Sequence, residues 1–303
     1  MSTPMSESPR PAVSSLPWPG TTAKASDFVA LAKPRLNLLV VASTGAGFFL
    51  AAERIDPAVL FHTIVGTALV AGGAAAFNEI IERDSDALMR RTRTRPLPTR
   101  RLEPAPATWF AFSLSILGLM QLAAGATTLA AGVALATLGS YVLVYTPMKR
   151  RSPMATLVGG IPGALPPVIG WTAASGELTA GAWVLFAIVF LWQMPHFLAI
   201  AWLCRDDYAR AGLKMLPVVE PDGRSTAQQT VLYAAVLVPV SLLPAVVGLA
   251  ATLYFAGALV LGLAFFALAV RFAARRDRST ALRLFLGSIV YLPLLWGILL
   301  LDH

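Results

Sequence analysis

The chain has 303 residues and a formal net charge of +8; 56% of its residues are hydrophobic and only 13% are charged. Together with a mean hydropathy of +0.68, this excludes an ordinary soluble domain, in which roughly 25% of residues are charged. A single cysteine, Cys204, excludes an intramolecular disulfide and a cysteine cluster for metal. Nothing in the sequence points to nucleic-acid binding.

The chain begins with a polar segment and continues as a series of apolar runs. Residues 1–26 are rich in Ser, Pro and Thr and lack the apolar core of a signal peptide, which predicts a disordered cytoplasmic tail. Residues 27–303 are expected to form one membrane domain. A helix needs about 20 mostly apolar residues to cross the hydrocarbon, and backbone in lipid must satisfy its own hydrogen bonds, so each long apolar run predicts a helix. Nine runs qualify: 32–52, 58–80, 107–125, 128–147, 155–174, 181–203, 229–249, 251–271 and 281–300.

The break between the seventh and eighth runs, around Thr252, is weak, so eight spans remain an alternative. The distribution of the basic residues over the loops favours nine spans. Cytoplasmic loops carry an excess of Lys and Arg, and with the N-terminus inside, nine spans place every one of the 24 Lys and Arg except Arg54 on the inner side. The sequence thus predicts an inner-membrane protein with a cytoplasmic N-terminus and an outward C-terminus. Its basic loops also favour contact with anionic membrane lipids.

The second predicted helix ends in an unusual charged stretch, NEIIERDSDALMRRTRTRPLP, at residues 78–98. Asn78, Glu82 and Asp86 are spaced i, i+4, i+8 and fall on one helix face, over roughly 12 Å. Such oxygen donors suit Mg²⁺, which is usually shared between protein carboxylates and substrate phosphates. The arginines that follow, Arg91 and Arg95 among them, are suited to phosphate oxygens. The alternative is a solvated helix end with ordinary i, i+4 ion pairs, Glu79 with Arg83 and Asp86 with Arg90.

A second acidic helix end follows the sixth run, where Asp206 and Asp207 precede further basic residues. The second and sixth helices therefore end in acids, whereas the fourth and eighth end in bases, at 149–151 and 271–278. This correspondence predicts an all-α membrane protein of two parallel four-helix halves plus a ninth helix, around a central cavity that opens inward. The prolines of GGIPGALPPVIGW, residues 159–171, predict that the fifth span is not a regular helix throughout.

Three stretches together resemble a known family: the charged stretch at 78–98, YTPMKRRSPMATLVGGIPGALPPVIGW, and FLWQMPHFLAIAWLCRDDYARAGLKMLPVV. They are similar to the intramembrane aromatic prenyltransferases of the UbiA superfamily, and most similar to its branch that farnesylates protohaem IX. The likeness spans about residues 28–300. One departure is that Glu79 stands where many members have an Asp, and the second acidic motif holds fewer acids, which weakens the assignment of a second metal.

The resemblance implies that the farnesyl group of farnesyl diphosphate is joined to a vinyl group of haem B, with addition of water, to give haem O. It implies Mg²⁺ as the cofactor, and haem A synthase or oxidase assembly proteins as partners. The residues expected to take part fall into two groups, one for the metal and one for the diphosphate. The metal is assigned to Asn78, Glu82, Asp86, Asp206 and Asp207, and the diphosphate to Arg91, Arg95, Lys149 and Arg150.

His196, within the sixth span, is a further candidate, because an ionisable residue in a membrane helix often serves function. It is expected to contact haem or to handle the proton of the added water; the alternative is a neutral imidazole held by a neighbouring helix. Lys33 and Arg35 recur in the resembling family, although an interfacial anchoring role explains them equally well. Three other functions stay open: a prenyltransferase acting on a quinone precursor, a transporter of an anionic lipid-like substrate, and a haem-binding assembly factor without chemistry.

Overall fold

The computed structural model describes residues 23–303, and within them it contains helices and no strand. Most of the predicted tail, residues 1–22, lies outside the described residues. The helices are α1 (Ala25–Ala32), α2 (Pro34–Ala51), α3 (Pro57–Leu88), α4 (Pro104–Gly125), α5 (Thr128–Gly139), the π-helix η2 (Ser140–Tyr145), α6 (Thr146–Met148), α7 (Ala155–Ala164), α8 (Pro166–Ser175), α9 (Ala180–Leu203), α10 (Arg205–Arg210), α11 (Leu216–Val219), α12 (Arg224–Val240), α13 (Leu243–Val246), α14 (Thr252–Arg275) and α15 (Arg278–Leu301). The first helix begins inside the segment predicted as a tail.

Nine segments of the described chain are long and apolar enough to span a membrane, which confirms the predicted number. Three of them are composite: α5, η2 and α6 form the fourth, α7 and α8 the fifth, and α12 and α13 the seventh. The fifth breaks at Leu165, between Pro162 and Pro166, as its prolines predicted. Large apolar side chains such as Trp109, Leu143 and Val290 are exposed on the outside of the bundle. That surface suits hydrocarbon rather than water, so the protein is a multi-pass membrane protein.

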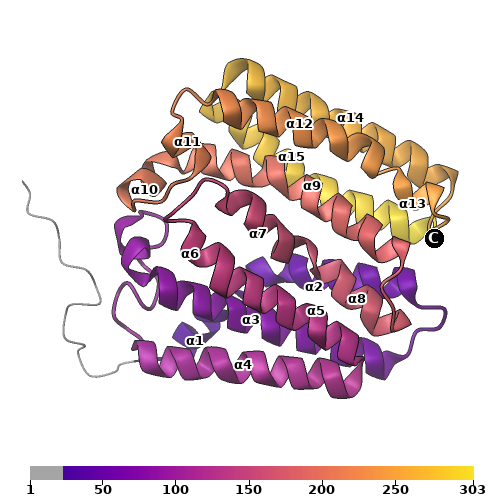
Figure 1. Ribbon diagram of the computed structural model, residues 1–303, viewed down its shortest axis with the longest axis horizontal. Coiled ribbons are helices and arrows are strands. Elements are labelled where there is room, and N and C mark those ends of the chain that lie inside the picture. The colour runs from indigo at the N-terminus through magenta and orange to yellow at the C-terminus, as the bar shows by residue number, and fades with distance from the viewer. Residues whose placement is uncertain (1–22) are drawn as a thin grey trace, which may run out of the picture.

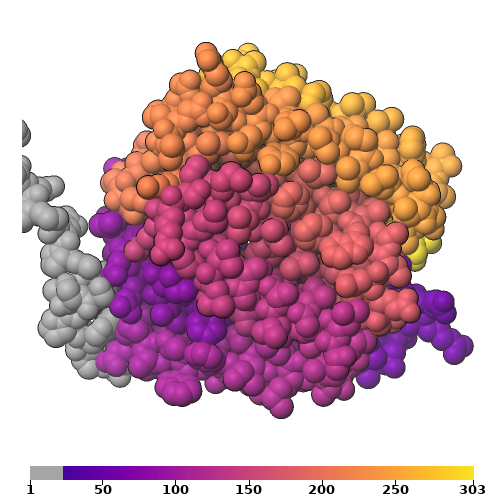
Figure 2. Space-filling model, in the orientation of Figure 1, coloured from indigo at the N-terminus to yellow at the C-terminus, as the bar shows by residue number. Residues whose placement is uncertain are grey.

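The helix packing repeats between the two halves of the chain. In the first half α2 packs on α3, α3 on α4, and α4 on α5; in the second, α7 packs on α9, α9 on α12, and α12 on α14. The ninth span, α15, lies against α9 and α14. Figure 2 shows the first half, in indigo and magenta, below the second half, in red, orange and yellow. The repeat agrees with the predicted pair of four-helix halves, while a central cavity stays a prediction.

The two halves meet where α2 packs along α8. A Cβ added to Gly47 of α2 would collide with the carbonyl oxygen of Pro167, and one added to Gly170 of α8 would collide with that of Thr44. Only glycine at both positions allows two helix backbones to approach this closely. We call this contact the glycine seam.

Helix ends place the charged loops together at one end of the bundle. Segments 89–103, 149–154 and 204–223 all lie there, on the side of α6, α10 and α11 and opposite the C-terminus (Figure 1). The backbone N–H of Lys214 donates to the carbonyl oxygen of Lys149 at 2.9 Å, and that of Arg90 donates to Oδ1 of Asp207 at 3.4 Å. Below we call this the basic end.

Candidate active site

The last turns of α3 carry the polar stripe that the sequence predicted. The helix runs to Leu88, well beyond the predicted span end at residue 80. Asn78, Glu79, Glu82 and Asp86 are all buried, with exposed fractions of 4%, 1%, 8% and 1%. A solvated helix end would leave these side chains exposed, so the alternative of a solvated helix end with ordinary ion pairs is wrong.

Basic residues from distant parts of the chain compensate these carboxylates. Nζ of Lys33, at the junction of α1 and α2, lies 3.3 Å from Oε1 of Glu79. Arg95 bridges two acids, with its Nε 3.4 Å from Oε1 of Glu79 and its Nη1 2.7 Å from Oδ2 of Asp86. The local pairs of the alternative interpretation, Glu79 with Arg83 and Asp86 with Arg90, are not among the ion pairs of the described residues. Lys33 therefore contributes to the site rather than anchoring the helix at the interface.

The segment after the fourth span supplies the second set of contacts. Nζ of Lys149 lies 2.9 Å from Oε1 of Glu82 and 4.5 Å from the centre of the Tyr145 ring. Arg150 donates through Nη2 to Oγ of Ser85 at 2.9 Å. The π-helix η2 precedes these residues and positions the Tyr145 ring under the ammonium group. π-Helical turns of this kind are frequent at functional sites.

Asn78, the first residue of the stripe, also contacts the fourth span. Asn78 donates through Nδ2 to Oγ1 of Thr146 at 3.3 Å, in α6. Thr92 donates through Oγ1 to the carbonyl oxygen of Asp86 at 2.9 Å, which fixes the turn that returns Arg95 to the acids. Asn78, Glu82 and Asp86 thus lie in one buried cluster with Lys149, Arg150 and Arg95, while their roles with metal and diphosphate stay predictions. We call this the charged cluster; it also includes Lys33, Glu79 and Ser85.

The second acidic motif divides into two unlike residues. Asp207 is largely covered: its Oδ1 accepts the Arg90 N–H and pairs with Arg210. Asp206 has a side chain that is 87% exposed, and its partner is its neighbour Arg205, at 3.7 Å. The structure thus holds Asp207 against the segment that follows α3 and directs Asp206 toward solvent.

Arg91 and Tyr208 join the two acidic motifs. Nη2 of Arg91 donates to the Tyr208 hydroxyl at 3.1 Å, and the guanidinium lies 5.3 Å from the centre of that ring. Burial raises the pKa of Tyr208 to about 12, so this phenol stays protonated at neutral pH. The hydroxyl can therefore donate a hydrogen bond while it accepts one from Arg91.

Burial opposes the charged form of both lysines of the charged cluster, but neighbouring charges make the net pKa shift differ between them. Burial lowers the pKa of Lys33, and the positive charge of Arg95 adds to this effect against the opposing charge of Glu79. Burial also opposes the charged form of Lys149, but Glu82 outweighs it and raises the pKa of that lysine above its ordinary value. Lys149 therefore remains cationic, whereas Lys33 loses its proton in a more accessible pH range.

His196 lies between α9 and α15 rather than in the charged cluster. Its Nδ1 is 2.7 Å from Oγ of Ser288, and its ring stacks on Trp192 with 5.2 Å between ring centres. Phe285 covers another side, at 5.1 Å. This environment matches the alternative in which a neighbouring helix holds the imidazole; a role with haem or water stays a prediction.

The charged cluster fits a divalent cation that is shared with a phosphate ligand. Oε2 of Glu79 and Oδ1 of Asp86 are buried without a hydrogen-bond partner, although a buried carboxylate oxygen normally has one. No three His, Cys, Asp or Glu side chains of residues 23–303 form a closed metal cage. Mg²⁺ does not require one, because one or two carboxylates usually hold it together with water and substrate phosphates. The two free oxygens are therefore suitable ligands.

The site predicted from the sequence did not include Glu79, Lys33, Ser85 or Tyr208, although Glu79 and Lys33 were noted. An acidic residue at position 79, within an apolar helix, is the feature of the sequence that could have identified Glu79 as a site residue. Nothing local identifies Lys33 as its partner, because 46 positions separate them. The pair forms only because α1 and α2 fold back against α3.

Known proteins are similar to this chain in sequence and in fold. The UbiA prenyltransferase family matches residues 39–295. A protoheme IX farnesyltransferase of Solibacter usitatus is 50% identical over 287 residues, covering 91% of this chain and 98% of that protein. One from Myxococcus xanthus is 46% identical over 280 residues, covering 92% and 95%.

Two solved structures have the same fold at low sequence identity. One, from work on a digeranylgeranylglyceryl phosphate synthase, has a TM-score of 0.78 at 15% identity and covers 91% of this chain and 97% of its own. A UbiA homologue of Archaeoglobus fulgidus bound to GPP and Mg²⁺ has a TM-score of 0.66 at 16% identity, with coverage of 90% and 99%. The chain therefore belongs to the UbiA prenyltransferase family and, within it, groups with the protoheme IX farnesyltransferases.

Proposed function

We propose that this chain is a Mg²⁺-dependent farnesyltransferase that converts haem B to haem O. The observation that carries the proposal is the charged cluster: buried carboxylates and cations alternate at the end of a membrane bundle, in a chain 50% identical to a relative of that name. In the reaction, the bond between farnesyl C1 and the diphosphate oxygen breaks, and C1 joins the terminal carbon of a haem vinyl group. Water adds its hydroxyl to the other vinyl carbon, and one proton is released.

The metal is assigned first to Glu79 and Asp86, whose free oxygens are the best donors, with Asn78 and Glu82 beside them. Asp207 is the member of the second motif that the fold brings nearby. Bound there, Mg²⁺ would neutralise diphosphate charge and so make diphosphate a better leaving group.

The cations of the cluster account for diphosphate binding. Arg95, Lys149 and Arg150 each contact an α3 side chain, so their donor groups lie at the place where a metal-bound diphosphate would sit. They stabilise negative charge that grows as the C–O bond breaks, and burial strengthens this effect. Arg91 extends the same array from the side of Tyr208.

The aromatic rings beside these cations match the other charge of the reaction. Loss of diphosphate leaves an allylic cation, and ring faces stabilise cations within about 6 Å. Tyr145 and Tyr208 already hold Lys149 and Arg91 in this way, at 4.5 Å and 5.3 Å. We assign these rings to the side of the site that faces the farnesyl carbon.

The proposal includes a location and partners. We assign the basic end to the cytoplasmic side, because cytoplasmic loops carry the excess of Lys and Arg, and the chain to the cell inner membrane with its N-terminus inside. Haem A synthase and oxidase assembly proteins are the expected recipients of the product.

The decisive experiment is chromatography of haem extracted after expression of the wild-type chain and of Asp86→Asn. The wild type is expected to yield a more hydrophobic, farnesylated haem, and Asp86→Asn to lower its amount at least 100-fold. Glu53→Gln serves as the matched control, because Glu53 is an exposed carboxylate outside the charged cluster. Wild-type levels of product from Asp86→Asn would overturn the site assignment.

Substrate choice is tested on membranes given farnesyl diphosphate that is labelled in its farnesyl group, with either haem B or 4-hydroxybenzoate as acceptor. Label transferred to haem B alone supports the proposal. Label transferred only to 4-hydroxybenzoate would assign the chain to the quinone branch, and no covalent product with either acceptor would favour a transporter or an assembly factor.

A further inference from the structure

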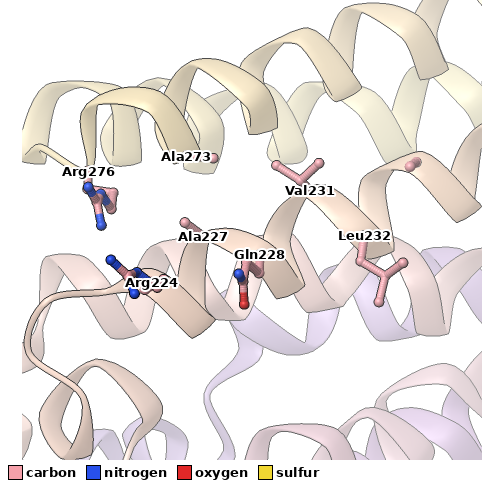
Figure 3. A pocket seen from close by; sticks show the side chains of 8 residues that line it. Arg224, Ala227, Gln228, Val231, Leu232, Ala273 and Arg276 are labelled. Atoms are coloured by element: carbon pink, nitrogen blue, oxygen red, sulfur yellow. The ribbon is translucent and has the colours of Figure 1, made fainter.

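A groove between α12 and α14 lies on the outside of the bundle, away from the charged cluster. The groove has a volume of 630 Å³ and is lined by Arg224, Ala227, Gln228, Val231, Leu232, Ala235, Ala273 and Arg276. Arg224 and Arg276 stand at its mouth, at the basic end, and the apolar residues extend along the helices (Figure 3). None of these residues belongs to the charged cluster.

The two arginines are available to a ligand. No ion pair joins either guanidinium to a carboxylate within residues 23–303, and both side chains are exposed. Arg276 donates through Nη1 to the backbone carbonyl of Asp222 at 3.2 Å. The Asp222 carboxylate accepts the backbone N–H of Arg224, also at 3.2 Å, and not its guanidinium. Two neighbouring cations held this way favour an anion with several acceptor oxygens, such as a phosphate ester.

The groove below the arginines favours a hydrocarbon chain. Arg224, Ala227, Val231 and Ala235 recur on one face of α12 and cover roughly 16 Å at 1.5 Å per residue. This length is about half of the ~30 Å hydrocarbon core, that is, one leaflet. The small side chain of Ala273 helps to open the groove from the α14 side, and Leu232, 59% exposed, forms its outer edge.

We propose that this groove is a binding site for one anionic phospholipid of the cytoplasmic leaflet. Its headgroup phosphate lies between Arg224 and Arg276, and one acyl chain lies on Val231 and Ala235. A soluble phosphate would use the arginines but not the apolar surface from Ala227 to Ala235, which is ~12 Å long at ~1.5 Å per residue. A zwitterionic lipid would use the surface but would neutralise less of the paired positive charge.

The test measures lipid binding to the purified full chain by native mass spectrometry, with phosphatidylglycerol and phosphatidylcholine as probes. Phosphatidylglycerol is expected to bind at least tenfold more tightly than phosphatidylcholine. The double variant Arg224→Gln/Arg276→Gln is expected to weaken phosphatidylglycerol binding about 30-fold, because each basic residue near the surface attracts anionic lipid with about a sixfold gain. The matched control, Arg275→Gln/Arg283→Gln, removes the same charge from the groove between α14 and α15 and is expected to change phosphatidylglycerol binding less than twofold.

The variant Ala235→Leu separates a lipid from a free phosphate, since it fills the groove and leaves both arginines in place. It is expected to weaken phosphatidylglycerol binding at least fivefold, and inorganic phosphate is expected not to displace the lipid. The proposal is overturned if both double variants lose binding equally, if the two lipids bind alike, or if Ala235→Leu binds as the wild type does. If the Arg224→Gln/Arg276→Gln chain does not fold, Ala235→Leu and the lipid comparison decide alone.

Discussion

The ion pair between Lys149 and Glu82 serves structure and, in our proposal, chemistry, and a double-mutant cycle separates the two. The side chains are only 13% and 10% exposed, with 2.9 Å between Nζ and Oε1. Lys149→Gln removes one partner and leaves the other carboxylate buried and uncompensated, which costs about 3 kcal/mol. That loss corresponds to a fall in Tm on the order of 5–10 °C for a chain of this size. Glu82→Gln should cost less, about 1–2 kcal/mol, because Lys149 retains the Tyr145 ring.

The double variant Lys149→Gln/Glu82→Gln carries no unpaired charge, so we expect its stability to return to within about 1 kcal/mol of the wild type. We expect its haem product to stay at least 100-fold below the wild type, because the diphosphate has lost a cation. Thermal unfolding of the purified protein and chromatography of extracted haem measure the two quantities. Arg151→Gln, an exposed change in the same loop, is the control for both. If the double variant is as unstable as Lys149→Gln, the ion-pair argument fails; if it regains activity, the role of Lys149 in the reaction fails.

Three further results are expected. Asp207→Asn should lower product formation at least tenfold more than Asp206→Asn in the haem assay, since only Asp207 contacts the segment that follows α3; equal losses would contradict the assignment of Asp207. Chelation of divalent metal should stop product formation, and added Mg²⁺ should restore it. Turnover in the presence of the chelator would contradict the proposed requirement for Mg²⁺. Because burial lowers the pKa of Lys33, its charged form is lost as pH rises through a value below the ordinary lysine pKa. Turnover should therefore fall at alkaline pH. The variant Lys33→Arg keeps its charge, so its turnover should fall only at a higher pH. Identical pH profiles of turnover for the wild type and the variant would exclude Lys33 as the titrating group.

The membrane spans were predictable because hydropathy is a local property of the sequence. All nine appear near their predicted positions, including the break in the fifth span. The error at the end of α3 has the same origin. A hydropathy pattern ends the span at the first acids, whereas the helix continues to Leu88 because distant cations permit those acids to be buried.

The site was predictable in its residue types but not in its pairing. Helical periodicity correctly placed Asn78, Glu82 and Asp86 together, since that inference needs only the geometry of one helix. The partners Lys33 and Lys149 are contributed by other spans, so no local pattern connects them with Glu79 and Glu82.

The glycine seam has a consequence for how substrates and products can move. Backbone touches backbone at Gly47 and Gly170, with no side chains between that could change rotamer to accommodate sliding. Rocking of one half against the other, the usual means by which repeat-built carriers expose a site to each face of the membrane in turn, would have to separate this contact. We therefore expect the two halves to stay together during turnover and the site to open only at the basic end.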